Sequence, residues 1–242
     1  MKNLIMLAIF SISTFVFSQE KLVVEYHFNY ELDLTGVTDQ KTKDFVKNTN
    51  ENTGDYTLVT TKNESYFNQV VKIDNSQGNG PKGGSMLAPT KNIYRNVDEN
   101  YFLEFMDFNG KKIIIKDSLK TFNWVIEKEK TKILGYEVRK AVFRKDKMTY
   151  EAWFAPQLAY KNGPADYAGL PGLILKLTEI SPTKTGLNKM HYVATSVNID
   201  ESAKIEKPTK GQIMSQKEFN QFADEYMKRL FGGGNDVEII RL

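Results

Sequence analysis

The stretch that decides the local fold reads Gly169-Leu170-Pro171-Gly172-Leu173-Ile174 and continues into Leu175-Lys176-Leu177. Pro171 fixes φ near the value of the second position of a turn, and Gly172 tolerates the positive φ that the third position of a type II turn requires. Four of the five residues that follow Gly172 are aliphatic, a composition typical of a strand buried on at least one face. The sequence therefore predicts a tight turn followed directly by a buried strand.

The hexapeptide from Gly169 to Ile174 resembles the defining motif of the GLPGLI family, envelope proteins of Gram-negative bacteria whose function is not established. The resemblance covers roughly residues 124–177, because further short matches occur in the same order: Gly135-Tyr136, Lys140-Ala141, Ala152-Trp153-Phe154-Ala155-Pro156 and Gly163-Pro164. Val138 stands where the family often has a Cys, and Pro156-Gln157-Leu158-Ala159-Tyr160 replaces a Pro-Glu-aliphatic-Pro run. The resemblance supplies no catalytic residue. Because the hexapeptide is predicted to form a turn that leads into a buried strand, we expect its role to be structural.

The N-terminus has the pattern of an export signal. Lys2 precedes an apolar run from Leu4 to Phe17, which is too short to span a bilayer, and Val16 and Ser18 fit the −3 and −1 positions of a cleavage site. We therefore expect residues 1–18 to be a signal peptide and residues 19–242 to form a single β-rich domain of the GLPGLI type. The mature protein is expected in the periplasm or associated with the outer membrane.

Composition narrows the class further. The chain has no Cys, so it offers neither a lipid-modified N-terminal Cys nor a disulfide, and we expect it not to be a lipoprotein. Its 33 Lys and Arg stand against 30 Asp and Glu, a net charge of +3, and these charges are interspersed, which gives no argument for nucleic-acid binding. No second apolar segment could span a membrane, so no transmembrane helix is expected in the mature chain.

Alternating apolar and polar residues predict about ten short strands, most of them neighbours along the chain. Asn109-Gly110 is a strong hairpin signal between two of them. The glycine-rich stretch of residues 74–91 is predicted to be a mobile loop. The expected strands lie at residues 22–30, 56–61, 65–70, 101–107, 111–116, 122–127, 135–143, 148–154, 173–177 and 189–198.

The clearest helix signal is near the C-terminus. Ser215-Gln216-Lys217-Glu218 is a capping box, apolar residues recur at helical spacing up to Phe231, and Gly232 supplies the stop. We expect this amphipathic helix to pack on the sheet. The predicted fold is thus a curved antiparallel sheet, as an open or half barrel, with one C-terminal helix, and a β-sandwich is the alternative.

No convergent catalytic set is visible in the sequence. The chain has only two histidines, His27 and His191, each within an expected strand and without a second ligand at a diagnostic spacing, and whether they meet stays open. The carboxylates are scattered, so no pair is specific. We therefore predict no cofactor and no metal, favour a binding or accessory protein over an enzyme, and keep an exported hydrolase or metal-dependent enzyme as the alternative.

Aromatic residues are the remaining unusual feature, with 15 Phe, 12 Tyr and 2 Trp. Their simplest role is core packing in a domain without disulfides. The alternative is an aromatic-lined groove between sheet and helix that accepts an apolar ligand or a segment of an outer-membrane protein. The residues expected to line such a groove are Tyr26, Phe28, Trp124, Tyr150 and Trp153.

Overall fold

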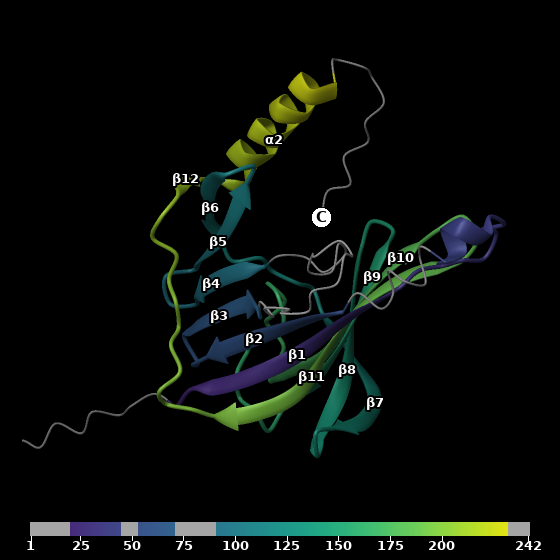
Figure 1. Ribbon diagram of the computed structural model, residues 1–242. Coiled ribbons are helices and arrows are strands. Elements are labelled where there is room, and N and C mark those ends of the chain that lie inside the picture. Colours follow the sequence, from purple (N-terminus) through teal and green to yellow (C-terminus); the bar gives the residue numbers. More distant parts are fainter. Residues whose placement is uncertain (1–19, 45–52, 71–90, 232–242) are drawn as a thin grey trace, which may run out of the picture.

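In the part of the chain that the structure describes, one twisted sheet of twelve strands forms the body of the protein (Figure 1). The computed structural model describes residues 20–44, 53–70 and 91–231, so the expected signal peptide and nearly all of the expected glycine-rich loop lie outside the described residues. The strands are β1 Leu22–Glu31, β2 Gly54–Thr60, β3 Glu64–Gln69, β4 Asn92–Asn96, β5 Tyr101–Phe108, β6 Lys111–Ser118, β7 Val125–Ile133, β8 Tyr136–Lys145, β9 Met148–Ala155, β10 Leu173–Pro182, β11 Leu187–Ile199 and β12 Gln212–Met214.

The strand order is β12-β6-β5-β4-β3-β2-β1-β11-β10-β9-β8-β7. All neighbouring pairs are antiparallel except β12 with β6, which are parallel. The two end strands, β12 and β7, do not pair with each other. The predicted open, mainly antiparallel sheet is therefore confirmed, and the sandwich alternative is not found.

The sheet curves around one large core, and we call the side that carries it the inner face. Phe102, Ile113 and Ile115 of β5 and β6 belong to the same buried cluster as Ala141 of β8 and Phe154 of β9. These strands are far apart in the strand order, so only a coiled sheet can bring them to one core. Rings pack together at the centre of the cluster: Phe28 and Tyr56 lie edge to face with centroids 6.2 Å apart, and Phe28 and Tyr192 are tilted with centroids 5.0 Å apart.

Residues 156–172, between β9 and β10, form a loop that fills the inner face. Nine of these residues are buried, namely Tyr160, Asn162, Gly163, Pro164, Ala165, Tyr167, Ala168, Leu170 and Gly172. A buried loop must satisfy its backbone polar groups. Backbone hydrogen bonds within the loop contribute, such as Gly169 N to Lys161 O at 3.0 Å. Bonds from β10 contribute as well: Leu173 N donates to Leu158 O at 3.0 Å and Ile174 N to Asn162 O at 3.0 Å. We call this segment the inner loop.

A second, smaller core lies on the opposite, outer face. It consists of Tyr94, Tyr101, Leu103 and Ile114, with Ile205 packed against them. The segment that leads from β11 to β12 crosses this face, and the Lys207 ammonium lies 5.5 Å from the Tyr94 ring centroid and 5.3 Å from that of Tyr101. The outer face of β4 to β6 is therefore covered by the chain itself.

The C-terminal helix α2, Gln216–Phe231, begins where the sequence predicts. Ser215 caps it, because Glu218 N donates to the Ser215 hydroxyl at 3.2 Å and Ser215 N donates to the Glu218 carboxylate at 2.7 Å. Its apolar side meets the end of the β5–β6 hairpin, where the ring of Phe108 lies 5.1–5.9 Å from three helix rings: Phe219, Phe222 and Tyr226. The helix thus docks on the tip of one hairpin and projects from the sheet (Figure 1). No helix in the described part of the chain is long and apolar enough to cross a membrane.

The hexapeptide turn differs in detail from the predicted type II turn. Gly172 N donates to Leu170 O at 2.8 Å, which closes a three-residue turn around Pro171. Gly172 has φ of 154°, and a Cβ built there would lie 2.3 Å from Ala155 O. The glycine is required by close approach of two backbones as well as by its dihedral angle. The buried strand that was predicted after it is β10.

Several strands depart from the predicted set. β4 and β12 carry short, mixed sequences that show no clear alternation, and both were missed. The predicted strand over residues 122–127 starts three residues later, at Val125, because Phe122 and Trp124 turn toward the inner loop, where the Trp124 indole donates to Ala168 O at 2.9 Å. Tertiary contacts override local alternation there.

Candidate ligand-binding site on the inner face

One row of paired residues crosses five adjacent strands on the inner face. Register pairs Tyr30 of β1 with Met190 of β11, Met190 with Glu179 of β10, Glu179 with Tyr150 of β9, and Tyr150 with Phe143 of β8. Side chains at directly paired positions lie on the same face of a sheet. A carboxylate therefore stands in the middle of a row that is otherwise aromatic or sulfur-containing.

The neighbouring row on the inner face is fully buried and shows where the Glu179 row lies relative to the core. It runs through Phe28, Tyr192, Leu177, Ala152 and Ala141, each of which is at most 1% exposed. Glu179 and its row neighbours are half-buried. The Glu179 row therefore forms the boundary between the packed core and the open side of the sheet.

An aromatic cluster adjoins the row, formed by Phe122, Trp124, Phe143, Tyr150 and Tyr167. Phe143 and Tyr150 are stacked with centroids 5.5 Å apart, Tyr150 and Tyr167 are 5.6 Å apart, and Phe122 lies 5.1 Å from Tyr167. Tyr167 is buried, whereas the other four rings are half-buried. The cluster therefore offers partly exposed aromatic surface beside a carboxyl group.

Charged groups from separate segments meet at the same place. Lys120 Nζ lies 2.6 Å from Asp166 Oδ2, and Lys91 Nζ lies 3.2 Å from Glu104 Oε1. The Tyr167 hydroxyl is close enough to the Glu179 carboxylate to lower the pKa of Glu179. We call Lys91, Glu104, Lys120, Asp166 and Glu179 the charged cluster.

The two carboxyls nearest the aromatic rings have opposite proton affinities. Burial raises the pKa of Glu179 to about 7, and the nearby charge of Asp166 raises it as well. For Asp166 burial alone would raise the pKa, but the charge and hydrogen bond of Lys120 outweigh it and the pKa is lowered. Such separated proton affinities are common at functional sites, although structural networks also produce them.

A buried polar contact fixes the inner loop beside this cluster. Arg95 of β4 is 6% exposed, and its Nη1 donates to Asn162 Oδ1 at 2.9 Å; Asn162 Nδ2 donates to Thr60 Oγ1 at 2.8 Å. Burial lowers the pKa of Arg95 to about 10, against the opposing charge of Asp166, so the guanidinium stays charged at neutral pH. This charge-assisted bond ties the loop to the far side of the curved sheet.

The groove residues expected from the sequence lie in three different places. Tyr26 and Phe28 are core residues, 1% and 0% exposed, and the Tyr26 hydroxyl donates to Ile174 O at 2.6 Å. Trp124 and Tyr150 belong to the aromatic cluster. Trp153 pairs with Lys140 of β8 and lies on the outer face, because it alternates with the inner residues Ala152 and Phe154.

The two histidines lie on the outer face of β1 and β11 and have separate partners. His27 Nδ1 lies 2.8 Å from Asp55 Oδ1, and His191 contacts Thr178 Oγ1 at 2.9 Å and Glu31 Oε1 at 3.3 Å. Burial lowers the pKa of His191. Among the described residues, no group of three or more His, Cys, Asp or Glu side chains could hold a metal ion.

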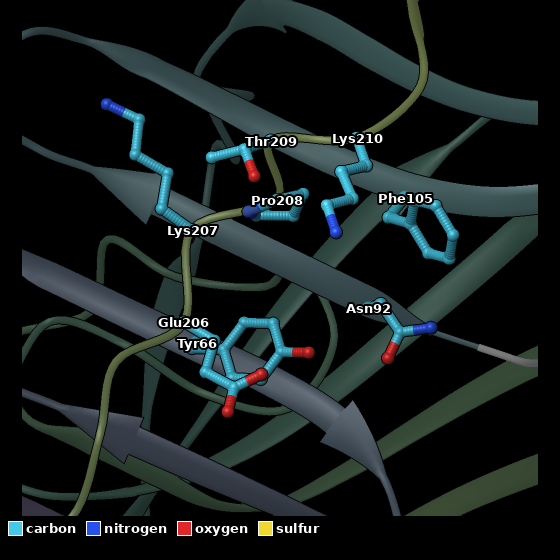
Figure 2. A pocket seen from close by; sticks show the side chains of 8 residues that line it. All are labelled: Tyr66, Asn92, Phe105, Glu206, Lys207, Pro208, Thr209 and Lys210. Carbon is cyan, nitrogen blue, oxygen red and sulfur yellow. The ribbon is translucent and has the colours of Figure 1, made fainter.

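A shallow pocket of about 320 Å³ lies on the outer face, beside the segment that covers it. Figure 2 shows its lining residues, with Tyr66, Asn92 and Phe105 from the sheet and residues 206–210 from the crossing segment. Its charged side chains are Glu206, Lys207 and Lys210, and Lys207 already stacks on Tyr94 and Tyr101. These three charged side chains are exposed to solvent, whereas Glu179 and Asp166 on the inner face are half-buried.

Sequence reasoning missed Glu179, Asp166 and Lys120. A signal for Glu179 existed, because Leu173, Leu175 and Leu177 precede it with a period of two residues and a carboxylate at the next inward position breaks an apolar face. No such signal existed for Asp166 or Lys120, which lie in irregular segments 46 positions apart. Only the curvature of the sheet brings them together.

Comparisons with known proteins show a family of unknown function and a shared fold. Residues 143–176 match the family described as "Protein of unknown function (Porph_ging)", a segment that contains the hexapeptide. No curated protein matches the chain. The match thus attaches no activity to this segment.

Among solved structures, PNGF-II in space group C2 aligns with a TM-score of 0.55 at 20% identity, and its P21 form aligns with 0.55 at 19%. Each alignment covers 84% of this chain and 32% of PNGF-II, so the chain spans about a third of the protein it matches. At this identity the similarity shows the fold alone. A Vibrio parahaemolyticus domain whose name refers to outer membrane lipoprotein sorting aligns with a TM-score of only 0.19 at 9% identity, covering 85% of this chain and 91% of that domain, too low to support an argument.

Proposed function

We propose that this chain is an exported binding or accessory protein of the bacterial cell envelope, of the GLPGLI type, with its ligand or partner held against the aromatic cluster. The observation that carries the proposal is the junction of four half-buried rings with the charged cluster on the inner face. Ligand sites typically combine aromatic surface with a few convergent polar groups. The occupant is an apolar or amphipathic molecule, or a segment of an outer-membrane protein.

The proposed setting follows from the sequence. Residues 1–18 serve as the signal peptide and residues 19–242 as one domain. Because the chain has no Cys, we propose that the mature protein works in the periplasm or at the outer membrane without a lipid on an N-terminal Cys.

Purification from the native envelope, followed by native mass spectrometry, tests the binding proposal. The wild type should carry a bound molecule or partner, and Tyr150→Ala on the inner face should lose it. Trp153→Ala, a half-buried aromatic on the outer face of the same strand, is the matched control and should retain it. Equal loss in both variants, or a stoichiometric metal on His27 or His191, would contradict the proposal.

A second candidate, an exported hydrolase, is favoured by one observation, the opposite proton affinities of Glu179 and Asp166. Such a pair can supply a general acid and a general base. A panel of chromogenic esters, phosphates, glycosides and peptides tests it. If the protein is a hydrolase, Glu179→Gln should lower turnover of one substrate by about 10²-fold or more with the fold intact; equal rates for both proteins would exclude this role for Glu179.

A further inference from the structure

Three positive groups beside Glu179 already have partners. Lys91 pairs with Glu104 at 3.2 Å and Lys120 with Asp166 at 2.6 Å. Arg95 donates to Asn162 at 2.9 Å. Two of the three carboxylates in the charged cluster are therefore each matched by one lysine.

Glu179 is the exception. The Tyr167 hydroxyl lowers its pKa, but within the described part of the chain no Lys, Arg or His nitrogen lies within 4.0 Å of its carboxylate. A half-buried carboxylate without a cation is costly when ionised. This position on β10 therefore lacks the counter-ion that the other two carboxylates have.

The surroundings of Glu179 suit a cation better than an anion. Tyr150 and Met190 are its direct neighbours in the row, and Tyr30, Tyr167 and Tyr192 are close enough for the Glu179 charge to raise the pKa of each hydroxyl. The faces of aromatic rings carry negative electrostatic potential, which attracts ammonium groups. Carboxylate and rings thus favour the same sign of charge.

We propose that the inner face binds a ligand through a positively charged ammonium group, which seats between the Glu179 carboxylate and the rings of Tyr150 and Tyr167. This inference rests on the proposed function, because it specifies the ligand class of that same site. The ammonium group replaces the proton of Glu179, and that proton is released to solvent. Lys120 and Lys91 stay paired with Asp166 and Glu104.

The exchange makes binding depend on pH in a defined direction. The pKa of Glu179 is affected by Tyr167 and Asp166 of the inner loop and by two lysines, Lys91 and Lys120. Three tyrosines of the sheet also lie near its charge: Tyr30, Tyr150 and Tyr192. Glu179 is largely protonated at pH 6 and largely ionised at pH 8, because its pKa is about 7. The affinity for an ammonium ligand should therefore rise by about tenfold between these pH values.

Two small probes of the same shape test this inference: 2-phenylethylamine, which is a cation at neutral pH, and 2-phenylethanol, which is neutral. Titration of the ¹⁵N-labelled protein can follow the indole N–H signals of Trp124 and Trp153 separately. At pH 8 the amine should bind about tenfold more tightly than the alcohol and shift the Trp124 signal.

In the Glu179→Gln variant, the preference for the amine over the alcohol and the pH dependence of amine binding should both disappear. Glu151→Gln, one position from Tyr150 on the outer face, should keep both.

The outcomes separate this inference from the proposed function. If both probes shift Trp124 with equal affinity, the ammonium inference fails and the aromatic site stands. If affinity for the amine falls from pH 6 to pH 8, or Glu179→Gln leaves it unchanged, the inference is overturned. Absence of binding by either probe also overturns it, whereas co-purification of a ligand from the envelope still decides the proposed function. Shifts confined to Trp153 would contradict both.

Discussion

At the scale of single residues, Gly172 shows why the hexapeptide contains its second glycine. A side chain there would place its Cβ 2.3 Å from Ala155 O, with φ at 154°. Gly172→Ala should destabilise the protein by about 2–4 kcal/mol, because backbone must move in addition to the dihedral strain, and Gly172→Val by at least as much. Chemical denaturation measures the change in the free energy of unfolding.

Gly169→Ala is the matched control. The φ of Gly169 is 91° and a Cβ there would meet nothing within 4 Å, so a destabilisation of about 1 kcal/mol is expected from the dihedral angle alone. Equal effects would show that close approach to Ala155 does not matter.

Glu179 should make stability depend on pH. Its pKa is raised from 4.5 to about 7 in the folded protein, so the fold binds the proton more tightly than the unfolded chain does. Protonated Glu179 therefore makes its full contribution to the free energy of unfolding below about pH 4.5. This contribution is lost as the pH rises to about 7. Glu179→Gln should match the wild type near pH 4.5 and exceed it by about 3 kcal/mol at pH 8.

Urea denaturation across this pH range measures the Glu179 effect. The exposed Glu201→Gln should stay within about 0.5 kcal/mol of the wild type throughout. A Glu179→Gln variant that is less stable than the wild type at pH 8 would mean that the ionised carboxylate is well paired in the fold. Residues that lower stability are often retained because function needs them. A stabilising effect of Glu179→Gln would therefore support a functional role for Glu179 in the candidate ligand-binding site.

At the scale of elements, the inner loop depends on Asn162. Its side chain accepts from Arg95 and donates to Thr60, and it is 1% exposed. Asn162→Ala should destabilise by about 2–4 kcal/mol, because it leaves a buried guanidinium without this acceptor, and protease cleavage within residues 156–172 should become faster. Asn198→Ala, on an exposed strand end, should change neither quantity measurably. An inner loop that stays resistant to cleavage in Asn162→Ala would show that apolar packing alone holds it.

The helix α2 depends on one hairpin ring. Phe108 contacts Phe219, Phe222 and Tyr226, so Phe108→Ala should release the helix and cost about 1–3 kcal/mol. Hydrogen exchange of residues 216–229 should accelerate, whereas β1 and β2 should keep their protection. Phe105→Ala removes a half-buried ring from the other face of the same strand and should leave helix exchange unchanged. Faster exchange in both variants would indicate general loosening of the sheet.

At the scale of the whole molecule, the sequence predicted the architecture better than the site. Alternation along Leu22 to Tyr30, the Asn109-Gly110 turn and the Ser215 capping box are local signals, and each marks an element that the structure contains. The site depends on register and curvature, which bring Lys120, Asp166 and Glu179 together across long sequence separations. Two of the five residues expected to line a groove, Tyr26 and Phe28, are core residues. Alternation along a strand predicts which face a side chain lies on, but not how much of that face the rest of the chain covers.

Tryptophan fluorescence can show whether the ligand binds on the inner face, because the chain has only two tryptophans and they lie on opposite faces of the sheet. Trp153→Phe keeps Trp124 in the aromatic cluster as the sole indole, and Trp124→Phe keeps Trp153 on the outer face. Both variants would be titrated with the molecule recovered from the envelope. If the ligand binds on the inner face, the emission of the protein that keeps Trp124 should change saturably and that of the protein that keeps Trp153 should not. A change confined to the protein that keeps Trp153 would contradict binding on the inner face.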